Sequence, residues 1–119
     1  MSGKPFEAMT DYELVDRFGK LALEQHNALE ADDADRYNAL LDRMAPIEVE
    51  LKQRGSLSYG RLQRLLGHPN ITVRLEAARR LMDTMPGTAR PVLQQIQTSG
   101  HFPHVGDAGM LLAHYDSKP

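Results

Sequence analysis

The chain contains no cysteine and no tryptophan, and only 6% of its 119 residues are aromatic. Without cysteine it can form no disulfide, no thiolate zinc site and no cysteine nucleophile. No apolar run approaches the roughly 20 residues that a membrane-spanning helix needs. The opening residues, MSGKPFEAMTDYEL, lack the apolar stretch of a secretory signal peptide. These absences favour a cytoplasmic protein without a membrane segment.

The size and composition are those of a soluble globular protein. Hydrophobic residues make up 41% of the chain and charged residues 25%. A chain of this length can bury one core and is too short for two domains of ordinary size. We therefore predict a single helical domain over residues 1–119.

Charge is unevenly distributed along the chain, although the net charge is only −2. Residues 1–51 hold five basic and twelve acidic side chains, net −7, whereas residues 52–80 hold seven basic and one acidic, net +6. Four arginines of the second region are candidates for a phosphate-binding surface: Arg61, Arg64, Arg79 and Arg80. The alternative, which we favour, is that they pair with the acidic N-terminal third or are simply solvated.

Residues 10–54 show the pattern of two long helices. Thr10 and Glu13 have the spacing of a capping box, and Asp33 is placed to cap the second helix. Apolar residues recur every three or four positions up to Gly55, which ends the pair. Pro46 lies inside the second pattern and predicts a kink, with a break into two shorter helices as the alternative.

Shorter helices are expected after Gly55, in a pair over residues 57–85 and a degenerate pair over residues 88–116. Their expected N-caps are Ser58, Asn70, Thr88 and Asp107. Alternation with period 2, the signature of a strand, persists nowhere in the sequence. The prediction is an all-α fold of five to seven antiparallel helices.

The stretch HPNITVRLEAARRL, residues 68–81, resembles the second half of a HEAT-type helical repeat. Val73, Ala77 and Leu81 lie four apart and share one helix face. The resemblance implies a right-handed helical array in which Arg74 reaches back to the turn before its helix. Such repeats usually carry an aspartate before the proline of that turn. Here His68 takes its place, so one expected partner of Arg74 is missing.

Nearly the full chain also resembles a family of short bacterial proteins, domain of unknown function two-thousand-nineteen. The resemblance runs through ELVDRFGKLALEQHNAL, YNALLDRMAPIEVELKQRG, LLGHPNITVRLEAARRL and HFPHVGDAGMLL. It implies a bacterial source and a HEAT-like helical fold, and it suggests an immunity-like role beside toxin systems. The family has no established activity, so it implies no catalytic residue.

Neither a catalytic motif nor a cofactor motif emerges from the sequence. The serines lie at breaks between helices, and no glycine-rich phosphate loop is present. A metal site could use His101, His104, Asp107 and His114, but the first three occupy a turn, and a turn does not fix ligand geometry by spacing. We favour structural roles for these four residues, no metal, no cofactor and no enzymatic activity.

The methionines admit two interpretations: an adaptable binding groove or core packing. Met44, Met82, Met85 and Met110 all occur at helical spacing with leucine and isoleucine, which favours packing. The function expected from the whole pattern is therefore the binding of an unidentified protein partner through an exposed helical face. The alternative is weak nucleic-acid binding through residues 52–80.

Overall fold

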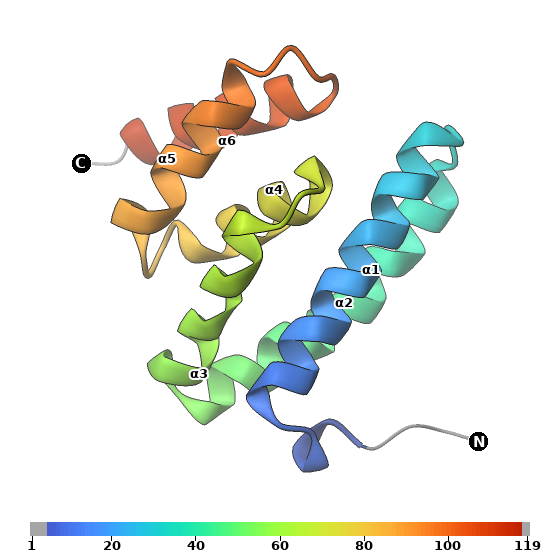
Figure 1. Cartoon of the computed structure of the whole chain (residues 1–119), viewed down its shortest axis with the longest axis vertical. Coiled ribbons are helices and arrows are strands. Elements are labelled where there is room, and N and C mark those ends of the chain that lie inside the picture. Colours follow the sequence, from blue (N-terminus) through green and yellow to red (C-terminus); the bar gives the residue numbers. More distant parts are fainter. Residues whose placement is uncertain (1–4, 118–119) are drawn as a thin grey trace. The chain divides into compact units, whose positions relative to one another are not determined.

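The computed structural model describes residues 5–117 and contains, within them, six α-helices and two 3-10 helices but no strand (Figure 1). The predicted all-α fold is confirmed, and the number of α-helices lies in the predicted range. The elements are η1 (Phe6–Ala8), α1 (Asp11–Glu30), α2 (Ala34–Arg54), α3 (Ser56–Gly60), η2 (Arg61–Gly67), α4 (Ile71–Leu81), α5 (Pro86–Gln97) and α6 (His104–Asp116). The chain divides into two compact units, the first ending at Arg61 and the second beginning at Leu62. The single domain stays a prediction.

In the first unit, α1 and α2 form an antiparallel pair (Figure 1). The capping box at the start of α1 is confirmed: the Glu13 N–H donates to Thr10 Oγ1 at 3.1 Å, and the Thr10 N–H donates to Glu13 Oε1 at 2.9 Å. Asp33 caps α2 by accepting from the Arg36 N–H at 3.0 Å. Both caps satisfy backbone donors that a helix start leaves unpaired.

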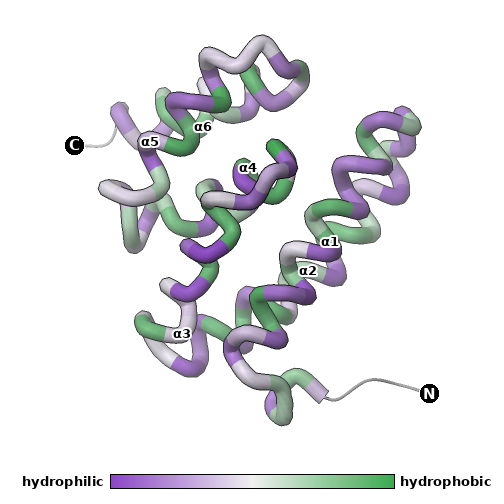
Figure 2. Tube along the Cα trace, viewed as in Figure 1, coloured by the Kyte–Doolittle hydropathy of each residue, from purple (hydrophilic) through white to green (hydrophobic). Residues whose placement is uncertain are grey.

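The core of the first unit lies between the apolar faces of these two helices. Along each helix, hydrophobic and hydrophilic residues alternate (Figure 2). The buried apolar side chains of the two helices are Leu14, Val15, Phe18, Leu21, Ala22, Ala28, Leu40, Met44, Ile47 and Leu51, and Tyr59 of α3 is buried as well. Burying a side chain of the size of leucine or phenylalanine stabilises the folded state by about 1.5–3 kcal/mol. This burial explains why the pair forms.

Pro46 does not interrupt α2, which runs unbroken from Ala34 to Arg54. Proline lacks an N–H and normally disrupts a helix interior. Here it is exposed, while Met44 and Ile47 on either side are fully buried in the core. Packing of the buried face therefore outweighs the lost hydrogen bond. The alternative of two separate helices is wrong, and the kink stays a prediction.

The second unit contains α4, α5 and α6, each of which contacts the other two. The order of helices is consistent with the HEAT-like arrangement, but the first half of the expected pair over 57–85 is not one regular helix. Ser58 lies inside the short α3 instead of capping a helix, and the residues that follow are 3-10. Leu62, Leu65 and Leu66 are buried as expected.

Two predicted N-caps in this unit are wrong because their helices begin earlier. Helix α5 starts at Pro86, two residues before Thr88, and α6 starts at His104, three residues before Asp107. Proline suits the first position of a helix, because its φ is already helical and its missing N–H would have had no partner there. Asp107 therefore lies in the first turn of α6, where a carboxylate complements the positive end of the helix dipole.

Candidate binding surface

Two of the four candidate arginines are engaged by one buried carboxylate. Glu76, only 1% exposed, accepts hydrogen bonds from Arg80 and, at 3.5 Å, from Arg79 Nη2. Arg80 is itself 7% exposed and also donates to the Glu76 carbonyl at 3.3 Å. Because Glu76 is the only acid among residues 52–80, the sequence already contains this partner. The pairing holds Arg80 within the protein and away from an external phosphate.

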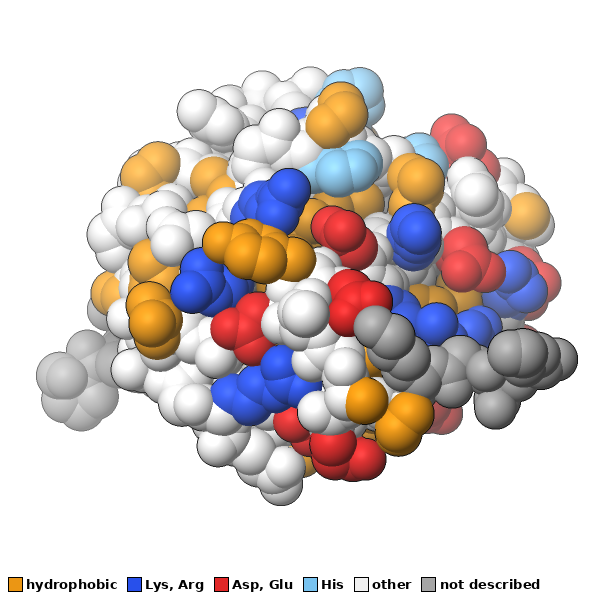
Figure 3. All heavy atoms as spheres, turned by 60° about the horizontal axis from the view of Figure 1, so that its bottom comes forward, with side chains coloured by type: hydrophobic (Ala, Val, Ile, Leu, Met, Phe, Trp, Pro, Cys, Tyr) orange, Lys and Arg blue, Asp and Glu red, His pale blue; other side chains and the backbone are white. Residues whose placement is uncertain are grey.

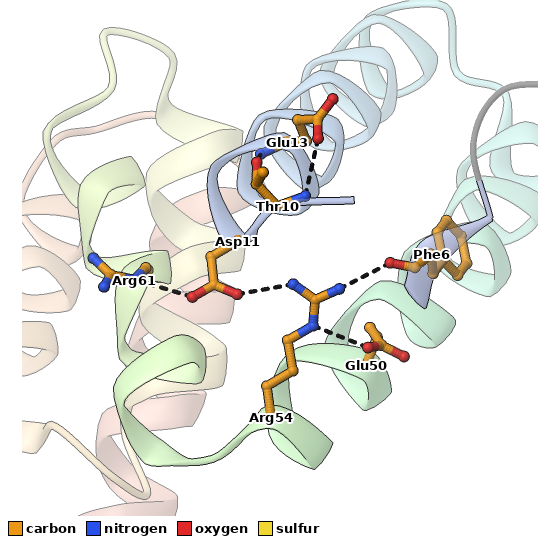
Figure 4. A network of polar contacts seen from close by, with 7 residues as sticks. All are labelled: Phe6, Thr10, Asp11, Glu13, Glu50, Arg54 and Arg61. Carbon is orange, nitrogen blue, oxygen red and sulfur yellow. Dashed lines mark hydrogen bonds and ion pairs between the residues drawn. The ribbon is translucent and has the colours of Figure 1, made fainter. Parts of the chain in front are cut away.

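Arg61 is engaged in the first unit, in a network centred on Asp11 (Figure 4). One Asp11 oxygen accepts from Arg61 Nε at 3.1 Å and the other from Arg54 Nη1 at 3.0 Å. Arg61 also donates to the Tyr12 hydroxyl at 3.0 Å. Arg54 reaches further, to Glu50 Oε2 and to the Phe6 carbonyl, both at 2.9 Å. The network joins the start of α1 to the end of α2 and the start of η2.

The electrostatics of Asp11 follow from this geometry. Partial burial raises the pKa of its carboxyl, but hydrogen bonds from Ser58, Arg54 and Arg61 outweigh that effect, so the net pKa is lowered from 3.8. Asp11 is therefore a charged structural centre at neutral pH. The guanidinium groups of Arg54 and Arg61 therefore have a structural role, because both hydrogen-bond to this carboxylate.

The four candidate arginines are divided between the two units. Arg61 belongs to the first unit, whereas Arg64, Arg79 and Arg80 belong to the second. Arg64 is exposed on η2, but Arg79 and Arg80 turn to Glu76. On the face drawn in Figure 3, basic and acidic side chains lie interspersed. This arrangement supports the interpretation that the arginines pair with acids.

Arg74 and Asn70 organise the turn before α4 as predicted. The Asn70 side chain accepts from the N–H groups of Thr72 and Val73, at 2.9 and 3.3 Å. Arg74 Nη1 donates to the carbonyls of His68 and Pro69, at 2.8 and 2.9 Å. Arg74 is half-buried. Backbone carbonyls thus replace the aspartate that HEAT-type repeats carry, while His68 Nδ1 accepts from the Asn70 N–H at 3.0 Å.

The histidines considered for a metal site have separate environments. His104 is 4% exposed, and its Nε2 lies 2.7 Å from Thr72 Oγ1 in a buried contact between α6 and α4. His101 and His114 are exposed on the surface. Within residues 5–117, no three histidine, aspartate or glutamate side chains converge in a way that could hold a metal ion. The absence of a metal stays a prediction.

The sequence pattern missed an exposed apolar ridge along α6. Met44 and Met82 are buried as predicted, but Met110 is 74% exposed and the prediction of core packing is wrong for it. Phe102, in the turn before α6, is 78% exposed. Exposed apolar clusters mark interaction sites more often than isolated exposed residues do. We call Phe102, Gly106, Met110 and Ala113 the α6 ridge.

The inner side of α6 accounts for the outward direction of this ridge. His104, Ala108 and Leu112 are buried and follow one another at four-residue spacing. Burial raises the pKa of Tyr115, and its hydrogen bond to Asp83 raises it further. Gly106, Met110 and Ala113 lie on the opposite side of the helix and are exposed. The four-residue spacing of the buried residues could have indicated the inner side of α6. Because this short helix has apolar residues on two faces, the sequence alone does not show which face is buried.

A small cavity lies at the turn between α1 and α2. Its volume is about 160 Å³, and it is lined by Ala28, Leu29, Asp32, Asp33, Ala34, Tyr37 and Asn38. The Asp33 carboxylate already accepts a hydrogen bond from the Arg36 N–H as the N-cap of α2. Asp32 has φ of 55° and serves the turn itself. The cavity therefore reflects the turn geometry and suggests no chemistry.

No helix within residues 5–117 has the length and apolar character to cross a membrane. A search of curated proteins finds no match. Among solved structures, the chain is similar to the crystal structure of the protein RPA1889 from Rhodopseudomonas palustris CGA009. The two share 38% sequence identity and a TM-score of 0.90, over 98% of this chain and 99% of that one. The model of a domain of unknown function, DUF2019, matches residues 12–116, and the chain therefore belongs to the DUF2019 family.

Proposed function

We propose that this protein is a non-catalytic module that binds another protein chain through the α6 ridge. The observation that carries the proposal is the exposure of Phe102 and Met110 on a surface with little charge. Residues 98–115 contain a single Asp, Glu, Lys or Arg side chain, Asp107, although charged residues make up 25% of the whole chain. The cores of protein interfaces are depleted in charge and enriched in phenylalanine and methionine.

The polar groups of the described residues support a structural role instead of a chemical one. The Asp11 network, the Glu76 pair and the Arg74 turn each consist of side chains that hydrogen-bond within the fold. A catalytic acid or base needs to reach a substrate atom at hydrogen-bond distance. Groups that are already engaged inside a small helical fold are poorly placed for that. An immunity-like role beside a toxin would fit a binding module and belongs to the same proposal.

Site-specific photocrosslinking in the source organism tests the proposal. A photoreactive phenylalanine analogue at position 110 is expected to give a discrete crosslinked protein product. The same analogue at position 57 is the matched control, because Leu57 is 75% exposed but lies between two serines in the first unit. Adding Gly106→Glu should abolish the product at position 110. Equal labelling at both positions, or none at 110, would contradict the proposal.

A further inference from the structure

The α6 ridge has an alternating shape. Gly106, Met110 and Ala113 follow at spacings of four and three residues, so they share one helix face. The Val105 N–H donates to the His101 carbonyl at 2.8 Å across the turn that precedes α6. Phe102 lies in that turn, outside the helix, and is a second large exposed side chain next to the start of α6. Along this helix face, a small residue, a large one and a small one succeed each other.

This alternation is complementary to itself when two copies run antiparallel. In that orientation Met110 of each copy meets Gly106 of the other. A Cβ placed on Gly106 would have no atom within 4 Å, so the space above it is open to a side chain from outside. A two-fold contact repeats every pairing twice, because the same patch is used by both subunits. A parallel arrangement would instead place large side chains against each other.

The charge of the ridge also suits a second copy. A two-fold contact brings a surface against itself, so charges of one sign on the ridge would face their own copies and repel. The ridge has none, and Asp107 lies to one side of it on the helix. Asp116, near the end of α6, is paired with Arg90. Little electrostatic repulsion therefore opposes contact between two ridges.

From these observations we infer that the protein forms an antiparallel, two-fold dimer through the α6 ridge, so that its partner is a second copy of itself. The inference rests on the proposed function, because it names the partner of the same surface. One helix face is smaller than the roughly 800 Å² per partner of a standard stable interface. The dimer is therefore weak and in equilibrium with the monomer.

Sedimentation equilibrium of the purified full chain tests the dimer directly. The apparent mass should rise from 13.3 kDa towards twice that value between about 10 μM and 1 mM protein. Gly106→Glu and Met110→Gln should each weaken the dimer by about tenfold or more, since both alter the centre of the contact. Leu57→Ser should leave it unchanged. Both ridge positions are exposed, so a circular dichroism melt should show that the variants remain folded.

Engineered cysteines test the antiparallel register, because the natural chain has none that could interfere. Gly106→Cys and Met110→Cys proteins are mixed in equal amounts under mild oxidation. The mixed 106–110 disulfide should form faster than either self-disulfide, since cysteines cannot bridge when their Cα atoms are more than about 7 Å apart. Leu57→Cys alone should crosslink at the slow rate of random collision.

Several outcomes would overturn the inference. These are a constant monomer mass up to about 1 mM, a dimer unaffected by Gly106→Glu, or self-disulfides that form as fast as the mixed one. The two proposals can fail separately. If the purified chain stays monomeric while position 110 captures a different protein in cells, the dimer is wrong and the proposed function stands. If position 110 captures nothing, the proposed function is wrong.

Discussion

Arg74 joins the start of α4 to the turn before it through two carbonyl acceptors, those of His68 and Pro69. Arg74→Ala should lower the free energy of unfolding by about 1 kcal/mol, because the turn is partly open to water that can replace the lost donor. Urea denaturation measures the change. The exposed Arg17 on α1 offers a control, and Arg17→Ala should have little effect. An Arg74→Ala variant as stable as the natural protein would contradict the structural role.

Glu76 and Arg80 form a buried ion pair one turn apart on α4. Glu76→Ala should cost about 3–5 kcal/mol, because it leaves the Arg80 charge buried without its partner. A combined Glu76→Leu and Arg80→Met variant should recover most of that loss, since no buried charge remains. Chemical denaturation of the three proteins gives the comparison. A double variant as unstable as Glu76→Ala would show that the loss comes from packing instead of charge.

Asp11 makes the stability of the first unit depend on pH in a defined direction. Its pKa is lowered from 3.8 in the folded protein, so its contribution is fully present above that value and is lost as the pH falls through the folded pKa. The stability difference between the natural protein and Asp11→Asn should be constant from pH 7 to pH 5 and shrink below about pH 4. Urea denaturation at several pH values measures it. A difference that widens on acidification would reverse the assigned sign.

At the scale of the element, local hydrogen bonds set the starts of α1, α2 and α4. Asn70 satisfies two N–H groups of the first turn of α4. Asn70→Ala should therefore destabilise the protein by about 1 kcal/mol, while Asn70→Asp should retain most of the stability. Thermal melts of the two variants make a matched test, because both change the same site. Equal melting temperatures for the two would mean that the cap contributes little.

The contrast between α2 and α6 shows how tertiary contacts decide what an element does. Pro46 left open a break into two helices beside the predicted kink, and α2 continues because its buried face packs against α1. In α6 both faces have apolar residues, and the side that contacts α4 and α5 becomes the inner one. The other side then presents Met110 to solvent. An element's outer surface is thus fixed only once its neighbours are known.

For the whole molecule, the pairing of arginines with acids predicts weak affinity for nucleic acid. Arg61 is held by Asp11, and Arg79 and Arg80 are held by Glu76. Binding should be no tighter than the non-specific range of about 10⁻⁴–10⁻⁶ M at physiological salt. Fluorescence titration with duplex and single-stranded oligonucleotides at two salt concentrations measures this affinity. Sub-micromolar binding that Arg61→Glu with Arg64→Glu abolishes would favour the nucleic-acid alternative over protein binding.

The sequence by itself determined the helical class, the start of the three capped helices α1, α2 and α4, and the buried stripe of the first helix pair. The direction of Arg74, whose hydrogen bonds span five and six residues, was implied by the resemblance to a HEAT-type repeat. Such features depend on groups within one or two helical turns, where the spacing along the chain fixes the spacing in space. Thr10, Asp33 and Asn70 could therefore be assigned from their neighbours alone.

Only the tertiary structure decided which acid holds Arg61, that α6 begins before Asp107, and that Met110 faces outward. Asp11 and Arg61 are 50 residues apart, so no local spacing brings them together. The N-cap residue of α6 is Pro103, whose side chain makes no capping hydrogen bond. The sequence therefore has no polar cap residue that marks where α6 begins. Apolar periodicity shows that a face exists, but only the positions of the other helices determine whether that face is buried or remains free to bind a partner.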